Sequence, residues 1–203
     1  MIKKVITLSF LILVIFLSCK ETPKKEIENK AKTFTIDSKT TSIKWIAYKT
    51  TSKVPVKGEF TEVEIDSLKT GTTAIETLNN LKFKIPVNSL HTNDTIRDGK
   101  LKKFFFGTME NTTNILGEIH MQNENSGSVD ITMNGITQTL PITYVVDGQM
   151  VTIEAVMDLD NWKAQAAITA LNTVCAELHT GEDGISKTWS EVKIEVATYL
   201  KEK

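Results

Sequence analysis

Few side chains in this 203-residue sequence combine the residue type and spacing that catalysis or metal binding requires. Its three histidines, His91, His120 and His179, fall in separate segments without metal-ligand spacing, whereas a structural zinc site needs four such donors. Cys175 lies among apolar residues at helical spacing, where we expect a buried structural thiol rather than a reactive one. No local signature marks a Ser, His and Asp set. The sequence therefore predicts no metal site and no enzyme.

Arg97 and Asp98 form the most suggestive polar pair in the chain. Thr95 precedes Asp98 by three residues, the spacing of a capping box, and this predicts a short helix over 95–105 with Thr95 as its N-cap. At the mouth of a barrel, the Arg97 guanidinium could contact an anionic head group, and Lys100, Lys102 and Lys103 would add positive charge. A capped helix with an exposed arginine and a solvated basic face explains the same residues.

Residues 1–18 resemble a secretory signal peptide. Two lysines precede an apolar run that is shorter than the roughly 20 residues a bilayer span needs. The run ends in Ser18-Cys19, which resembles a bacterial lipobox. This resemblance implies cleavage before Cys19 and acylation of Cys19, which would attach the protein to a membrane. The alternative is an ordinary secretory signal in which Cys19 is incidental.

Residues 19–32 are charged and poor in apolar side chains, so they predict a tether between the lipid anchor and the folded domain. The pair Lys20-Glu21 is similar to the surface-export signals of some Bacteroidetes lipoproteins, although a solvated tether explains it as well. We therefore expect a cell-envelope protein, an outer-membrane lipoprotein that faces either the periplasm or the cell surface.

The overall composition indicates a single domain rich in strands. The 24 basic and 25 acidic side chains nearly balance, which argues against nucleic acid as a partner because phosphate contacts need a basic surplus. The 28 Thr residues favour strands. No linker or repeat divides the chain, so one domain is expected over 33–199. The sequence leaves the oligomeric state open, a dimer included.

Alternation of apolar and polar residues predicts eight or nine short antiparallel strands. A change of phase after Phe60 predicts a bulge near Glu62. Asn134-Gly135 and Asp147-Gly148 each predict a hairpin turn. The predicted strands cover 43–47, 54–65, 83–87, 115–121, 129–133, 140–146, 151–157 and 192–198.

Such strands, each with one apolar face, predict an all-β fold, either a closed barrel or a sandwich. A barrel of about eight strands encloses room for its own side chains or for one small ligand. Two segments have helical spacing instead. The helix near 95–105 would present Leu101, Phe104 and Phe105 on one face, and a longer amphipathic helix is expected near 161–178.

Three segments, taken in order, resemble the YceI-like family. Residues 92–106 resemble a family segment with a Thr, an Arg-Asp pair, a Leu and a Phe pair, which are here Thr92 or Thr95, Arg97-Asp98, Leu101 and Phe104-Phe105. Residues 129–144 resemble the family's hairpin. Residues 170–192 resemble the ending of a lipoprotein branch, from a Bacteroidetes-type bacterium. The resemblance covers nearly all of Phe34 to Val196. It implies an antiparallel lipocalin-like barrel whose apolar interior binds a polyisoprenoid chain, as of an isoprenoid quinone or a polyprenyl phosphate.

The resemblance leads to two hypotheses about function. The first is a membrane-tethered carrier or sequestering protein for a polyisoprenoid or similar apolar lipid, with no other cofactor. The alternative is a structural or interaction module whose barrel is filled by its own side chains. The helix near 161–178 bears on both, because it replaces a short connection of simpler members and could cover a barrel end or fill the cavity. The predicted lining residues are Trp45, Phe60, Phe83, Ile85, Val129, Ile131, Leu140, Ile142, Ile153 and Val196.

Overall fold

The structure is a computed structural model that describes residues 32–65 and 69–203. Residues 31–203 form one compact unit. The predicted signal peptide, Cys19 and the tether up to residue 31 lie outside the described residues. Within the described part, no helix is long and apolar enough to span a bilayer.

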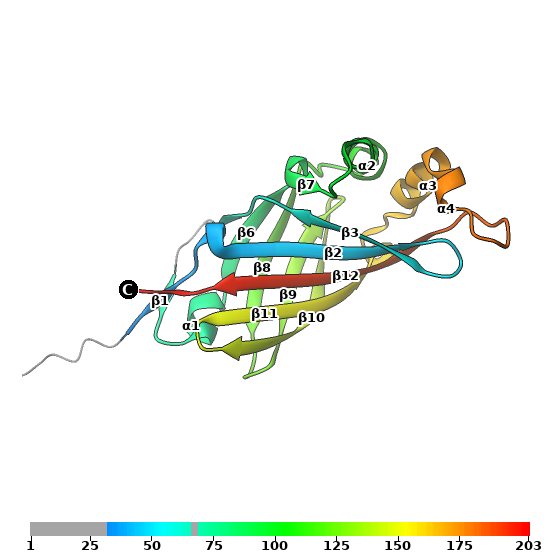
Figure 1. Ribbon diagram of the computed structural model, residues 1–203. Helices are drawn as coiled ribbons and strands as arrows, with labels where there is room; N and C mark the ends of the chain where they lie inside the picture. The colour runs from blue at the N-terminus through cyan, green and yellow to red at the C-terminus, as the bar shows by residue number, and fades with distance from the viewer. Residues whose placement is uncertain (1–31, 66–68) are drawn as a thin grey trace, which may run out of the picture. The chain divides into compact units, whose positions relative to one another are not determined.

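One large antiparallel sheet makes up most of the fold (Figure 1). Its strands follow the order β4-β6-β8-β9-β10-β11-β12-β2-β3-β7. The alternation that predicted them recurs in the burial of β11, where every second side chain is buried. The strands are β2 (Thr41–Lys49), β3 (Val54–Phe60), β4 (Glu64–Ile65), β6 (Leu81–Pro86), β7 (Leu90–His91), β8 (Asn114–Met121), β9 (Ser126–Met133), β10 (Ile136–Asp147), β11 (Met150–Asp158) and β12 (Thr188–Tyr199).

The two strands at the ends of this order continue two strands within it. β4 follows β3 after residues 61–63, and β7 follows β6 after residues 87–89. Segment 54–65 therefore pairs with segment 81–91 twice, with β3 against β7 and β4 against β6. The sheet curls back on itself as eight long segments, which confirms the predicted lipocalin-like antiparallel barrel.

The phase change predicted near Glu62 is confirmed, because Phe60, Val63 and Ile65 all face the interior. The extra residues of the pairing, however, lie in the partner segment. Glu64 lies four positions after Phe60, but their partners Lys84 and Leu90 lie six positions apart. A 3-10 turn, η2 (Val87–Ser89), takes up the difference.

Both predicted hairpins are present, between β9 and β10 and between β10 and β11. The second turn lies one residue later than predicted: Asp147 pairs with Met150, so Gly148 and Gln149 form the turn instead of Asp147 and Gly148. Asn134 and Gly135 have φ values of 52° and 67°, and positive φ at both central residues defines the type I′ turn that suits twisted strands. The Asn134 side chain also holds the turn against the next helical segment, since its Nδ2 donates to the Trp162 carbonyl at 2.8 Å.

Short helices gather at one end of the barrel (Figure 1). They are α2 (Thr95–Lys100), the π-helical turn η3 (Leu101–Phe105), η4 (Phe106–Thr108), η5 (Leu159–Trp162), α3 (Gln165–Val174) and α4 (Ala176–His179). The prediction of one helix over 161–178 is wrong in its continuity. Lys163 has a left-handed φ of 52°, which separates η5 from α3. Cys175 interrupts the helix again, between α3 and α4. Cys175 is buried, as expected.

The predicted helix near 95–105 exists, but its cap differs from the prediction. Asp94 rather than Thr95 is the N-cap, because its carboxylate accepts from the backbone N–H groups of Ile96 and Arg97 at 3.0 Å each. A charged acceptor at this position also complements the helix dipole. Asp98 is therefore free of the capping role and bonds elsewhere.

A small second sheet covers the other end of the barrel (Figure 1). Its strands β1 (Phe34–Thr35), β5 (Thr70–Gly71) and β13 (Lys201–Glu202) have two residues each, and α1 (Ala74–Leu78) follows β5 and packs beside them. The short turn η1 (Ser38–Thr40) connects β1 to β2. Leu78 and Leu200 are almost fully buried here, with 0% and 1% exposure. Both ends of the barrel are therefore covered.

Candidate functional site

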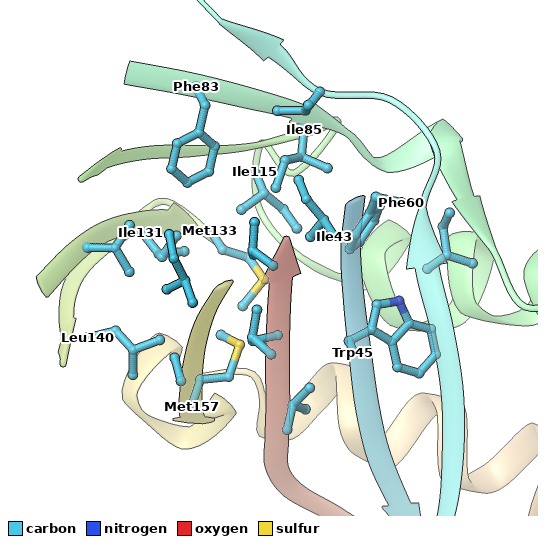
Figure 2. A pocket seen from close by; sticks show the side chains of 18 of the residues that line it. Ile43, Trp45, Phe60, Phe83, Ile85, Ile115, Ile131, Met133, Leu140 and Met157 are labelled. Atoms are coloured by element: carbon cyan, nitrogen blue, oxygen red, sulfur yellow. The ribbon is translucent and has the colours of Figure 1, made fainter. Parts of the chain in front are cut away.

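The barrel encloses a cavity of about 220 Å³ (Figure 2). Its wall is apolar almost throughout, and consists of inward side chains from the long strands together with side chains from the helices at one end. A cavity with such a wall offers water no hydrogen-bond partners, so it favours an apolar occupant. The wall is therefore suited to the burial of apolar surface.

All ten predicted lining residues contribute to the wall of this cavity. Figure 2 shows Trp45, Phe60, Phe83, Ile131 and Leu140 directed into it from different strands. That these side chains contact a lipid stays a prediction. The structure adds inward neighbours on the same strands, such as Ile43 and Ile194, which the same alternation could have identified.

The helical layer closes one end of the cavity without filling it. Ile168 and Leu171 of α3 line the cavity, and so do Leu101, Phe105 and Phe106 of the neighbouring turns. Phe106 packs edge-on against Phe105, with ring centroids 4.9 Å apart. This layer decides between the two roles left open for the helix near 161–178: it covers a barrel end.

The predicted apolar face of Leu101, Phe104 and Phe105 is wrong in one member. Leu101, Phe105 and Phe106 reach the cavity, whereas Phe104 does not line it. The cause is the π-helical turn over Leu101–Phe105, because i→i+5 bonding widens the turn and brings residues four and five positions on to one face.

Two aromatic rings lie flat on glycines of the neighbouring strands. Trp45 pairs with Gly58, and Phe83 pairs with Gly117. A Cβ added at either glycine would overlap the facing ring. The glycines thus let two large rings rest against the wall, and this arrangement keeps the interior open.

The indole N–H of Trp45 has no hydrogen-bond partner among the described residues. Trp45 is only 7% exposed, and its Nε1 is one of two buried side-chain polar atoms without a partner in the described part of the chain; the other is Thr35 Oγ1. A buried donor left unpaired costs about 1–3 kcal/mol. This tryptophan therefore lowers stability relative to a purely apolar ring in the same place.

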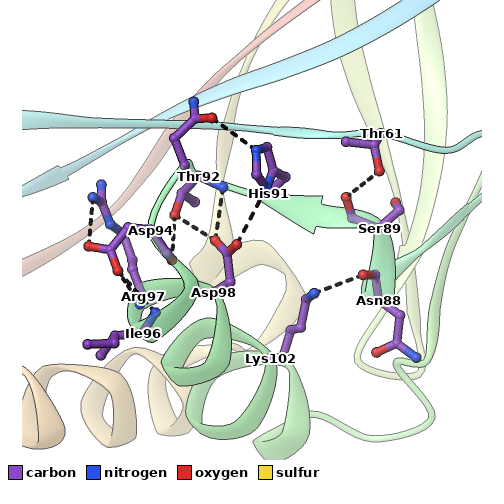
Figure 3. A network of polar contacts seen from close by, with 11 residues as sticks. Thr61, Asn88, Ser89, His91, Thr92, Asp94, Ile96, Arg97, Asp98 and Lys102 are labelled. Atoms are coloured by element: carbon purple, nitrogen blue, oxygen red, sulfur yellow. Dashed lines mark hydrogen bonds and ion pairs between the residues drawn. The ribbon is translucent and has the colours of Figure 1, made fainter.

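Arg97 and Asp98 belong to a polar network beside the cavity (Figure 3). Asp98 is buried and accepts from the backbone N–H and the hydroxyl of Thr92 at 2.9 and 2.6 Å. Its other oxygen lies 3.6 Å from His91 Nδ1. These contacts hold α2 against β7, so Asp98 positions the helical layer.

Arg97 itself lies outside the cavity wall. Its Nη2 is 3.2 Å from Asp94 Oδ2, and bonds from the backbone and side chain of Arg97 lower the pKa of Asp94 from its ordinary 3.8. The suggested head-group contact of Arg97 stays a prediction. Among the described residues, no three His, Cys, Asp or Glu side chains group as metal ligands would.

A curled antiparallel barrel around an internal apolar cavity defines the class of lipocalin-like folds. Within that class, the chain belongs to the YceI-like domain family, whose model matches residues 34–199. The match to the lipoprotein branch stays a prediction.

Two solved structures have a similar fold. A polyisoprenoid binding domain from Saccharophagus degradans, implicated in plant cell wall breakdown, aligns with a TM-score of 0.61 and 11% identity over 84% of this chain and 98% of that one. BcnA of Burkholderia cenocepacia aligns with a TM-score of 0.52 and 15% identity over 82% of this chain and 99% of that one. No curated protein matches the chain. At these identities the likeness concerns the fold, and function has to be argued from the site.

Proposed function

We propose that this protein binds a polyisoprenoid or a similar apolar lipid inside its barrel, as a carrier or sequestering protein without chemistry of its own. The observation that carries the proposal is the covered apolar cavity of about 220 Å³. Family membership agrees with it, and a similarly folded structure is described as a polyisoprenoid binding domain. The cavity argues against the alternative of a barrel filled by its own side chains.

Burial of the chain supplies the affinity. Each CH₂-sized group removed from water contributes about 0.8 kcal/mol, so a prenyl chain gains several kilocalories per mole from a few isoprene units. Branched, flexible lipids suit a wall built from aliphatic and aromatic side chains on many strands. Few polar contacts are then needed for tight binding.

The test uses the chain from residue 20 onward, which lacks Cys19, purified without detergent. We expect mass spectrometry of its organic extract to show a prenyl lipid, and the emptied protein to take up added isoprenoid quinone. An empty extract together with no uptake would refute the proposal.

The proposal includes a membrane tether at Cys19. The support is the sequence alone: an apolar run that ends in Ser18-Cys19, followed by a charged segment. Acylation at Cys19 would place the protein in the outer membrane, facing the periplasm or the cell surface. The Cys19→Ala variant should leave the membrane fraction for the soluble one. An unchanged membrane fraction would contradict the tether.

A further inference from the structure

The helix-covered end of the cavity has a polar rim, which we call the basic rim and define by Lys49, Lys100, Asn172, His179 and Thr188. Thr188 lines the cavity. Its hydroxyl lies 2.7 Å from His179 Nδ1 and donates to Asn172 Oδ1 at 2.9 Å. All five residues are half-buried, between the apolar interior and solvent.

Lys49 extends from the cavity side of its strand. It is the cross-strand partner of Thr188, and directly opposed residues have their side chains on the same face of the sheet. The alternation of β2 agrees, since Ile43, Trp45 and Ala47 all line the cavity. The side chain of Lys49 makes no hydrogen bond or ion pair with any described residue.

Lys100 brings a second positive charge to the rim from α2. Its Nζ donates to the Val174 carbonyl at 3.2 Å, at the end of α3, and no carboxylate pairs with it in the described chain. Burial and the charges of Lys49 and Lys100 lower the pKa of His179 from its ordinary 6.5. Among the residues that the structure describes, no acidic group opposes this lowering of the His179 pKa. The rim is therefore a positively charged edge on an apolar cavity.

From this arrangement we infer that the basic rim binds an anionic phosphate head group while the prenyl chain of the same lipid fills the cavity. The inference rests on the proposed function. A phosphate oxygen would accept charge-assisted hydrogen bonds from Lys49 and Lys100, and the Thr188 hydroxyl and His179 Nε2 lie in the same rim. A neutral prenol or quinone would leave both ammonium groups without a counter-charge.

The test compares three probes on the chain from residue 20 onward, which lacks Cys19: geranylgeranyl monophosphate, geranylgeraniol and inorganic phosphate. Lys49→Met is the variant, and Lys44→Met, on the exposed outer face of the same strand, is the matched control. Calorimetry should show that Lys49→Met weakens binding of the monophosphate about tenfold or more, the loss of one charge-assisted bond. Binding of geranylgeraniol should change by less than about twofold, and Lys44→Met should change neither.

Lys49→Arg, which keeps the charge, should retain the preference for phosphate, and Lys49→Gln serves as a second neutral variant if the methionine variant fails to fold. Equal binding of monophosphate and prenol by the unaltered protein would overturn the inference but leave the proposed function intact. Binding of neither would overturn both. Inorganic phosphate that binds as tightly as the monophosphate would show a free-anion site and overturn the head-group assignment.

Discussion

Replacing Ile142 with Trp tests whether the barrel interior is a binding site. Ile142 lies in β10, is 4% exposed and lines the cavity. In a filled core, so large an insertion forces neighbours out of place and costs about 1–3 kcal/mol or more. Here the indole can enter the cavity of about 220 Å³, so we expect the free energy of unfolding to fall by less than about 1 kcal/mol.

The same change should weaken lipid binding strongly. If the indole displaces one five-carbon isoprene unit, about 0.8 kcal/mol per carbon gives a loss of about 4 kcal/mol. That loss corresponds to roughly a thousandfold weaker affinity. A shorter prenyl chain, which needs less of the cavity, should lose less.

Two measurements check this reasoning: urea unfolding followed by circular dichroism, and uptake of isoprenoid quinone by the purified protein. Val145→Trp is the control, because Val145 is 66% exposed on the same strand. It should alter neither result. Loss of stability in Ile142→Trp with unchanged lipid uptake would refute the reasoning and favour a barrel filled by side chains.

Three further predictions concern single side chains. Trp45→Phe removes the unpaired Nε1 donor and should change the free energy of unfolding by less than about 1 kcal/mol. Trp162→Phe loses a 3.0 Å hydrogen bond to the Ile131 carbonyl and should cost about 1–2 kcal/mol more. Equal losses of the two variants in denaturant unfolding would contradict this prediction. Asn134→Ala should lower the free energy of unfolding by about 2–3 kcal/mol in the same assay, because the residue has a positive φ and loses its hydrogen bond to the Trp162 carbonyl. Asn134→Gly should recover the share of this loss that comes from the positive φ. Full stability of the alanine variant would disprove the role of the turn. The pKa of His179 is lowered in the folded state, so as the pH falls His179 is protonated in the unfolded chain before it is protonated in the folded one. The free energy of unfolding should therefore fall as the pH drops below 6.5. His179→Asn should lessen that fall, and identical pH profiles of the two proteins would exclude this contribution.

The long strands and their inward faces could be predicted from the sequence, because period two is a local property. Ile142 and Val196 alternate with polar neighbours, and this alternation indicates which face of the sheet they occupy. The small sheet could not be found in this way, since each of its strands, such as Phe34–Thr35, has two residues. The pairing of these short strands depends on the tertiary fold, which brings distant segments of the chain together.

The helical end shows a second limit of sequence reasoning. A regular period of 3.6 residues selects Phe104, while the π-helical turn selects Phe106. The basic rim was missed because Lys49, Lys100 and His179 are far apart in sequence. One signal was available: Lys49 continues the inward series of Trp45 and Ala47, and a lysine in such a series is unusual.

The way in which the sheet closes has a consequence for how a long lipid enters. Segments 54–65 and 81–91 meet through two residue pairs at each of two places, while β11 and β12 pair continuously from Met150 to Asp158. The wall is thus held by the fewest ladder bonds along this line, and local opening is cheapest where such bonds are few. A polyprenyl chain could enter through this side of the barrel, without passing either covered end. Faster amide exchange along Phe60 and Leu90 would reveal the opening.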